Sequence, residues 1–220
     1  MSEGFQFSRA VEKFKSSWAL FQKDLAGFGL MTFIGLLVAG ATGGILSAPI
    51  MIGILKSVRK QEKGEKVVVK DAFSGMSQFG PAFLLMLVVG AIMGGIVGAM
   101  LIVKLIFGLT ARIHFLYVIL TIIWVLAAIV VYAGSAVALG LVARMGMVLI
   151  SEENASFSDA MKRSVNWVKG NVKRALELFA ALFLCGLTGL IPVVGGIAAA
   201  SLGAMTAVAF YDEEKKAGSL

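Results

Sequence analysis

Long uncharged runs constrain this chain more than any other feature of its sequence. Four such runs, each longer than thirty residues, cover positions 25–55, 72–103, 113–143 and 178–211. A membrane-spanning helix needs about 20 apolar residues to cross a hydrocarbon core of roughly 30 Å. Because 59% of the residues are also hydrophobic, we expect an all-α, polytopic integral membrane protein.

Lysine and arginine gather between these runs and are rare within them. Twelve of the twenty lie in segments 56–71 and 144–177, and Lys104 and Arg112 flank the short bridge between the middle runs. Cytoplasmic loops normally carry the excess of positive charge, because positive segments translocate poorly. Four crossings divide the charges twelve to eight, whereas six crossings place eighteen on one side. The charges therefore favour six crossings, with the first and last runs each folded back as a hairpin.

The geometry of the first run stays open at this point. Half of it would form a helix of about 15 residues, or roughly 23 Å, which is short for a crossing. Turn residues stand at Gly40–Gly44 and at Pro192–Gly196. A re-entrant hairpin, or one long tilted helix kinked before Pro49, would also accommodate residues 25–55.

The polar segments are predicted to contain amphipathic helices. Before the first run, Phe7, Phe14 and Trp18 belong to an apolar stripe with spacings of three and four residues. Such a helix tends to lie in the headgroup region with its apolar face toward the lipid. We therefore assign residues 1–24 to an interfacial helix. The remaining parts are a single transmembrane domain (25–211), with basic cytoplasmic segments at 56–71 and 144–177, and a polar tail (212–220).

A short sequence pattern recurs along the chain. Phe7–Lys13 resembles Phe157–Arg163, each is followed by a tryptophan, and residues 71–79 form a fainter third copy. Each copy leads into an apolar run. The repetition indicates three units, each made of a surface helix and a pair of crossings.

These features resemble a broad group of bacterial six-helix inner-membrane proteins, the YciC-like proteins and relatives of the membrane domain found beside glycerophosphodiester phosphodiesterases. The resemblance is carried by the Phe- and Trp-bearing N-terminal helix, by Pro49 and Gly53 before a basic segment, by Phe157–Ser164 with Trp167, and by Ile191–Gly196. It implies a fold and the bacterial inner membrane, while the charge distribution places both termini in the cytoplasm. It implies no reaction.

Two sets of residues are candidates for binding. Basic side chains on the polar segments are expected to meet anionic lipid headgroups, although a solvated rim that only sets orientation is the alternative. They are Lys13, Lys15, Lys23, Arg59, Lys60, Lys63, Lys162, Arg163, Lys169, Lys173 and Arg174. Small residues at helix-face spacing are expected to pack against other helices, a membrane-protein partner or a second copy. They are Gly40, Gly44, Gly90, Gly94, Gly98, Gly195, Ala199 and Gly203.

Catalytic, metal and cofactor chemistry is not expected. His114 is the one histidine and Cys185 the one cysteine, so neither a clustered metal site nor an intrachain disulfide is predicted. Glu177 is expected to pair with Lys173 or Arg174 on its own helix. The bases flank apolar runs, which favours lipid over nucleic acid as the partner.

The sequence thus favours a non-enzymatic membrane component that docks lipid or a protein partner. The alternative is a transporter or lipid-moving protein with a path between interrupted hairpins, since interrupted segments often mark a transporter's binding site.

Overall fold

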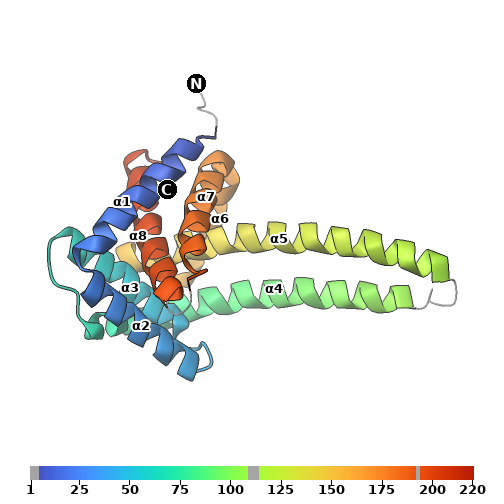
Figure 1. The fold of residues 1–220 in the computed structure, drawn as a ribbon, viewed down its shortest axis with the longest axis horizontal. Coiled ribbons are helices and arrows are strands. Elements are labelled where there is room, and N and C mark those ends of the chain that lie inside the picture. The colour runs from blue at the N-terminus through green and yellow to red at the C-terminus, as the bar shows by residue number, and fades with distance from the viewer. Residues whose placement is uncertain (1–4, 109–113, 192–193) are drawn as a thin grey trace. The chain divides into compact units, whose positions relative to one another are not determined.

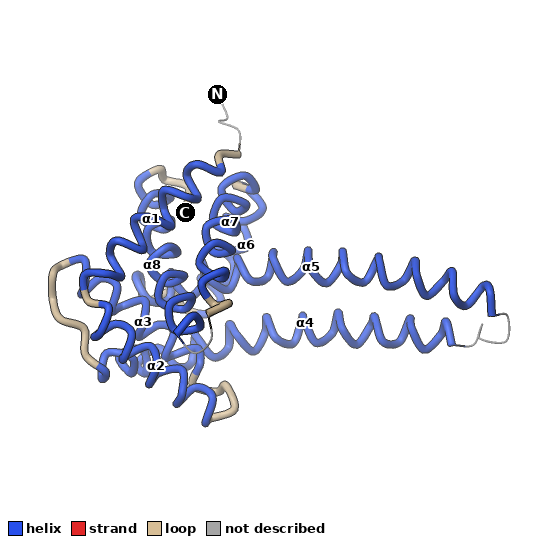
Figure 2. Tube along the Cα trace, in the orientation of Figure 1, coloured by secondary structure: helices blue, strands red, loops and turns tan. Residues whose placement is uncertain are grey.

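The computed structural model describes residues 5–108, 114–191 and 194–220, and these form helices joined by short connections, with no strand among them (Figures 1 and 2). The predicted all-α class is confirmed. In chain order the first elements are α1 (Phe7–Lys23), α2 (Leu25–Ala41), α3 (Ser47–Glu62) and the 3₁₀ helix η1 (Val69–Gln78). They are followed by α4 (Phe79–Gly108), α5 (His114–Glu153), α6 (Phe157–Gly170), α7 (Val172–Thr188) and α8 (Val194–Lys216).

The chain divides into two compact units. The larger one comprises Met1–Met86 and Leu141–Leu220, and the smaller one comprises Leu87–Gly140. We call them the compact unit and the hairpin unit. The hairpin unit contains most of α4 and most of α5, which are 30 and 40 residues long.

Three of the described helical stretches are long and apolar enough to cross a membrane. They are Val69–Gly108, Tyr117–Glu153 and Val194–Lys216. A fourth results if α1 and α2 count as one span, although the two helices meet at an angle of 97°. The membrane character predicted from composition therefore agrees with the helices that form.

Neither terminal apolar run forms one continuous helix. In the first run α2 ends at Ala41 and α3 begins at Ser47, and between them Gly43 and Gly44 have φ of +61° and +86°. Glycine adopts this left-handed backbone at little cost because it has no Cβ. In the last run α7 ends at Thr188, and each broken pair packs against itself. A single long helix over residues 25–55 is thus excluded.

The same break corrects one predicted packing face. Gly40 belongs to α2, Gly44 lies in the turn, and Ala48 belongs to α3, so these residues do not share a helix face. A Cβ built on Gly40 or Gly44 would have no atom of a neighbouring element within 4 Å. These glycines serve the turn rather than a helix contact.

Two of the three sequence copies begin helices that end alike. The helix α1 ends at Asp24, with φ −143° and ψ 60°, and α6 ends at Asn171, with φ −127° and ψ 50°. In each case the next helix starts at the following residue. The shared junction supports the repeat of surface helix and apolar helix predicted from the sequence.

Glycines bring α3 and η1 into close contact in the compact unit. A Cβ on Gly53 would lie 2.1 Å from the carbonyl oxygen of Ala72, and one on Gly75 would lie 2.0 Å from that of Pro49. The two backbones can approach this closely only because both positions lack a side chain. The third sequence copy, at residues 71–79, therefore packs as a short 3₁₀ helix beneath α3.

The helix α5 extends further than the sequence pattern indicated. It continues from Ala143 to Glu153, and Met145 and Val148–Ile150 are buried. The first ten residues of the predicted basic segment 144–177 thus belong to a packed helix. The apolar stretch after Arg144 is the signal that charge counting overlooked.

Candidate functional site

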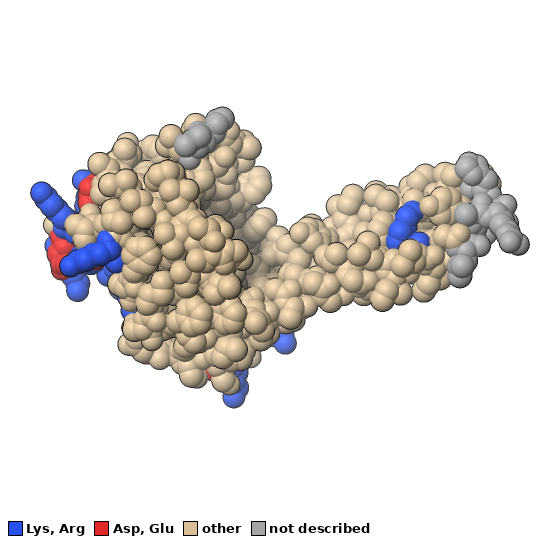
Figure 3. Space-filling model, turned by 90° about the horizontal axis from the view of Figure 1, so that it is seen from below, with Lys and Arg blue, Asp and Glu red and all other residues tan. Residues whose placement is uncertain are grey.

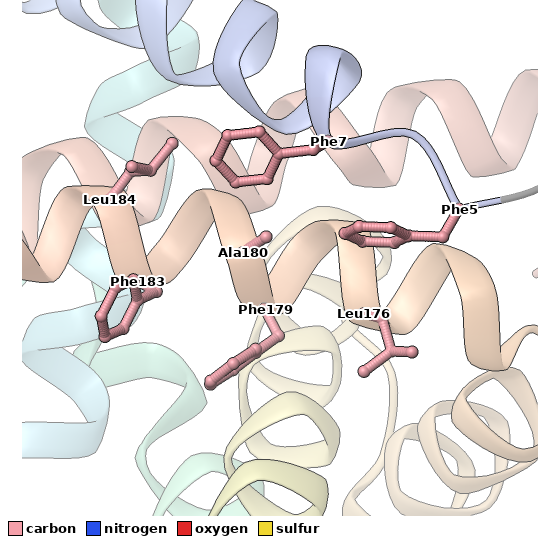
Figure 4. A pocket seen from close by; sticks show the side chains of 7 residues that line it. All are labelled: Phe5, Phe7, Leu176, Phe179, Ala180, Phe183 and Leu184. Atoms are coloured by element: carbon pink, nitrogen blue, oxygen red, sulfur yellow. The ribbon is translucent and has the colours of Figure 1, made fainter.

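An apolar groove lies between the start of α1 and the outer face of α7. It encloses about 380 Å³. Phe5 and Phe7 approach α7 from above in Figure 4, and side chains of α7 between Leu176 and Leu184 line the rest of the groove. The lining residues are Phe5, Phe7, Leu176, Phe179, Ala180, Phe183 and Leu184. Phe183 remains 57% exposed, so the groove is open to the surroundings along α7.

A charged cluster borders the same groove at the N-terminal end of α7. The carboxylate of Glu177, which is only 1% exposed, accepts a hydrogen bond from the backbone N–H of Gln6 at 3.0 Å. It also forms ion pairs with the guanidinium groups of Arg9, at 3.3 Å, and Arg174, at 3.5 Å. The prediction that Glu177 pairs with a basic residue of its own helix is confirmed for Arg174. An apolar groove with guanidinium groups at one end suits an amphiphile with an anionic head.

The acidic end of α8 connects this cluster to other helices. Glu213 pairs with Lys13 at 2.9 Å and with Arg174 at 3.1 Å. The indole N–H of Trp167 donates to Glu214 at 3.0 Å. Residues from α1, α6 and α7 therefore meet at the last turns of α8.

A second group of ion pairs joins the ends of α3, α5 and α8. We call these ion pairs, together with the cluster around Glu177 and Glu213, the charged layer. Arg59 contacts Glu152 at 2.8 Å and Asp212 at 2.6 Å, and thereby joins the ends of α3, α5 and α8. Its hydrogen bond to Asp212 is the main reason that its pKa is raised above the ordinary value. Arg163 of α6 bonds Glu153, which likewise raises the pKa of Arg163. On the face drawn in Figure 3, charged side chains gather toward one end of the compact unit.

Ten of the eleven predicted headgroup-binding residues fall into two groups, and the eleventh, Lys173, is not without a partner. Lys13, Arg59, Lys60, Arg163 and Arg174 form ion pairs with carboxylates of the protein, Lys60 with Asp71 at 2.8 Å. Ion pairs are not found within the described residues for Lys15, Lys23, Lys63, Lys162 and Lys169. The first group consequently holds helices together, although Arg174 also stands at the end of the groove. The second group has no ion pair within the described residues that would compete with a headgroup.

The two predicted glycine ladders that lie on continuous helices also differ. On α8, a Cβ at Gly195 would lie 2.2 Å from the carbonyl oxygen of Thr188, and one at Gly203 would lie 3.4 Å from the guanidinium of Arg144. Ala199 lies near Gly189 of α7. On α4, a Cβ at Gly90, Gly94 or Gly98 would meet nothing within 4 Å.

The hairpin unit has one charged side chain among its described residues. The ammonium of Lys104 bonds Thr121 Oγ1 at 3.1 Å and lies 5.0 Å and 5.6 Å from the ring centres of Tyr117 and Trp124. These residues occupy successive turns of α5. Arg112, the other predicted span end, lies outside the described residues.

Metal-binding clusters of three or more His, Cys, Asp or Glu side chains are not found in the described parts of the chain. Cys185 is buried on α7 and lies 3.4 Å from Thr206 Oγ1.

Sequence reasoning missed three parts of this site. The phenylalanines of the groove look like ordinary members of apolar stretches in the sequence. Only the four-residue spacing between Phe179 and Phe183 indicates that two of them share a helix face. The acidic triplet Asp212–Glu214 was assigned to the edge of a tail, although its position after an apolar run indicated a helix end. Arg144 was assigned to the basic cytoplasmic segment 144–177, whereas it lies within α5.

Neither the protein-family models, nor the curated proteins, nor the solved structures include a match to this chain. The resemblance to YciC-like proteins therefore remains a prediction.

Proposed function

We propose that this chain is a non-enzymatic, six-crossing protein of the bacterial inner membrane that docks an anionic lipid on its compact unit. The observation that carries the proposal is the groove between α1 and α7. Every side chain that lines it is apolar, and its end at Leu176 adjoins the Arg9–Glu177–Arg174 cluster. An acyl chain fits the first feature and a phosphate fits the second.

The direction of α7 suits a lipid of the cytoplasmic leaflet. The helix begins beside the charged layer, at Val172, and the groove continues along it to Leu184. Eight residues of helix, from Leu176 to Leu184, cover about 12 Å. A headgroup at the charged layer would therefore place the first part of its acyl chain against Phe179 and Phe183.

Two observations support six crossings. Both terminal apolar runs are broken into paired helices, and the charged layer joins the ends of α3, α5 and α8 to α1 and α7. Basic segments and both terminal arms then share one side of the membrane, as the distribution of lysine and arginine favours. The helices α2 and α7, of 17 residues each, would span only about 26 Å, so the bilayer around them would be thinned.

The topology can be tested by labelling single cysteines at Gly64, Gly108 and Ser156 in a chain that lacks Cys185. Six crossings require that Gly64 and Ser156 react only from the cytoplasm and Gly108 only from the opposite side. Labelling of Ser156 from the same side as Gly108 would contradict six crossings.

The groove can be tested by filling it. Ala180→Trp places an indole between Phe7 and Phe179, whereas Ala127→Trp adds the same bulk at an exposed position of α5. After exchange into a nonionic detergent, native mass spectrometry should find phosphatidylglycerol on the wild type and on Ala127→Trp. We expect at least tenfold less on Ala180→Trp. Equal lipid retention by all three proteins would refute the groove as a lipid site.

A second function, the movement of lipid across the membrane, is favoured by one specific residue. Arg144 is a cation in the interior of the compact unit, beside Met51 and Gly203.

A further inference from the structure

Arg144 is a guanidinium without an anionic partner inside the compact unit. Its hydrogen bond from Nη1 to the sulfur of Met51, at 3.4 Å, is a weak one. Of the thirteen Asp and Glu residues only Glu3 lies outside the described residues, and none of the other twelve is within ion-pair distance of Arg144. Arginine offers five N–H donors. Most of the hydrogen-bonding capacity of Arg144 is therefore unused.

Three helices independently place this guanidinium far below the charged layer. The ion pairs of Arg59 join α3, α5 and α8 at Arg59, Glu152 and Asp212. Arg144 precedes Glu152 by eight residues, Met51 precedes Arg59 by eight, and Gly203 precedes Asp212 by nine. At a rise of 1.5 Å per residue, each offset corresponds to about 12 to 14 Å.

The side chain does not reach back toward the charged layer. A Cβ built on Gly203 would lie 3.4 Å from Nη2 of Arg144 and 3.7 Å from Cζ, so the guanidinium lies at the level of Gly203 itself. Half of a hydrocarbon core is about 15 Å. With the charged layer at the membrane surface, the cation thus lies near the middle of the bilayer.

An unpaired cation at this depth is expensive, and such residues generally face the interior and serve a pathway or a ligand. Arg144 is partly exposed rather than sealed, and Gly203 beside it carries no side chain. We propose that Arg144 is an oxyanion-binding site within the compact unit, and that its ligand is the phosphate group of an anionic lipid.

The choice of a phosphate follows from the chemistry of the donor. A planar guanidinium binds two oxygens of a phosphate at once, which a lysine ammonium cannot do. The neighbours Met51 and Gly203 are uncharged and suit the apolar part of a lipid better than a hydrated ion. An anionic headgroup that binds here would stand between the two leaflets, as in a protein that moves lipid.

Isothermal titration of the full-length protein in a nonionic maltoside detergent can test this site. The probes are dodecyl phosphate, inorganic phosphate and the zwitterionic dodecylphosphocholine. We expect dodecyl phosphate to bind Arg144→Met at least tenfold more weakly than the wild type. The matched control Lys66→Met, which removes an exposed cation of the connection between α3 and η1, should bind as the wild type does.

A second variant separates binding from folding. Met51→Glu puts a carboxylate where the Met51 sulfur now accepts from Arg144, and the internal ion pair should displace the ligand while the protein stays folded. Its melting temperature should equal or exceed that of the wild type. Arg144→Met should also melt higher than the wild type, because it removes an uncompensated interior charge.

The outcomes distinguish the source of the phosphate and can refute the site. If only dodecyl phosphate binds in an Arg144-dependent way, the ligand is a lipid. If inorganic phosphate binds equally well and also depends on Arg144, the ligand is a free oxyanion instead. Undiminished binding to Arg144→Met or to Met51→Glu, or no binding to the wild type, overturns the proposal. Ala180→Trp should keep this binding, so failure of the groove and failure of this site are separable.

Discussion

The compact unit and the hairpin unit use the same small residues in different ways. In the compact unit, Gly53 and Gly75 stand where a methyl group would collide with a backbone oxygen. In the hairpin unit, Gly90, Gly94 and Gly98 face open space. Small residues at helical spacing therefore permit close packing, but a second element within reach decides whether packing occurs.

Charge separates the two units as well. The compact unit pairs several of its cations with carboxylates from other helices, as Arg59 does with Asp212 and Arg9 with Glu177. Within the described residues of the hairpin unit, Lys104 has aromatic rings and a hydroxyl as its neighbours instead. The compact unit thus depends on specific polar pairs, and the hairpin unit depends on its apolar surface.

The comparison predicts its largest effect at the glycine contacts. Gly75→Ala would place a methyl group 2.0 Å from the carbonyl oxygen of Pro49, and no rotamer can relieve a clash with backbone. We expect the free energy of unfolding to fall by about 3 kcal/mol or more, measured by unfolding in mixed SDS micelles. Gly53→Ala should behave in the same way.

Gly94→Ala in the hairpin unit is the matched control. Alanine has the higher helix propensity, so this change should leave stability equal or raise it by up to about 1 kcal/mol. If Gly94→Ala destabilised the protein as much as Gly75→Ala, the proposed difference between the units would be wrong.

A smaller loss is expected at the charged cluster. Glu177→Gln keeps the size of the side chain but removes the negative charge that Arg9 and Arg174 share. Leaving these charged donors without their acceptor should cost about 2 kcal/mol. The same unfolding assay applies, with the exposed Glu65→Gln as control. A loss no larger than that of the control would mean that Glu177 contributes no more than a solvated surface charge.

The sequence predicted the helical class and the broken runs because both depend on local chemistry. Apolar length identifies spans, and glycines such as Gly43 and Gly44 mark a turn wherever they lie. The repeat of surface and apolar helices was visible in Phe7 and Phe157, and the matching junctions at Asp24 and Asn171 agree with it.

The sites were harder to predict, because they depend on which helices meet. Arg9 and Glu177 are separated by 168 positions in the chain, and no local pattern indicates that they pair. Counting positive charges assigned Arg144 to the basic cytoplasmic segment 144–177, although the charge of one residue cannot interrupt a helix that continues with Met145 and Val148–Ile150. The groove arises from the contact of α1 with α7, which periodicity does not specify.

The hairpin unit should show a modest coupling between Lys104 and Trp124. A double-mutant cycle with Lys104→Met and Trp124→Leu isolates their cation–π contact, now 5.6 Å from ammonium to ring centre. We expect a coupling free energy of about 1 kcal/mol. A coupling free energy near zero would mean that Lys104 marks the end of a span without a stabilising contact to Trp124.

The smallest effect concerns a buried hydroxyl pair of the compact unit. Thr32 of α2 and Ser201 of α8 are both fully buried, and their hydroxyl oxygens lie 3.0 Å apart. Ser201 also bonds the carbonyl of Ile197, so it keeps a partner when Thr32 is lost. Thr32→Val preserves the shape of the side chain and should cost only about 0.6 kcal/mol, the average for a hydrogen bond between membrane helices. A loss above about 2 kcal/mol would indicate that this pair holds α2 to α8. The contrast between specific pairing in the compact unit and apolar packing in the hairpin unit would then be stronger than the ion pairs alone imply.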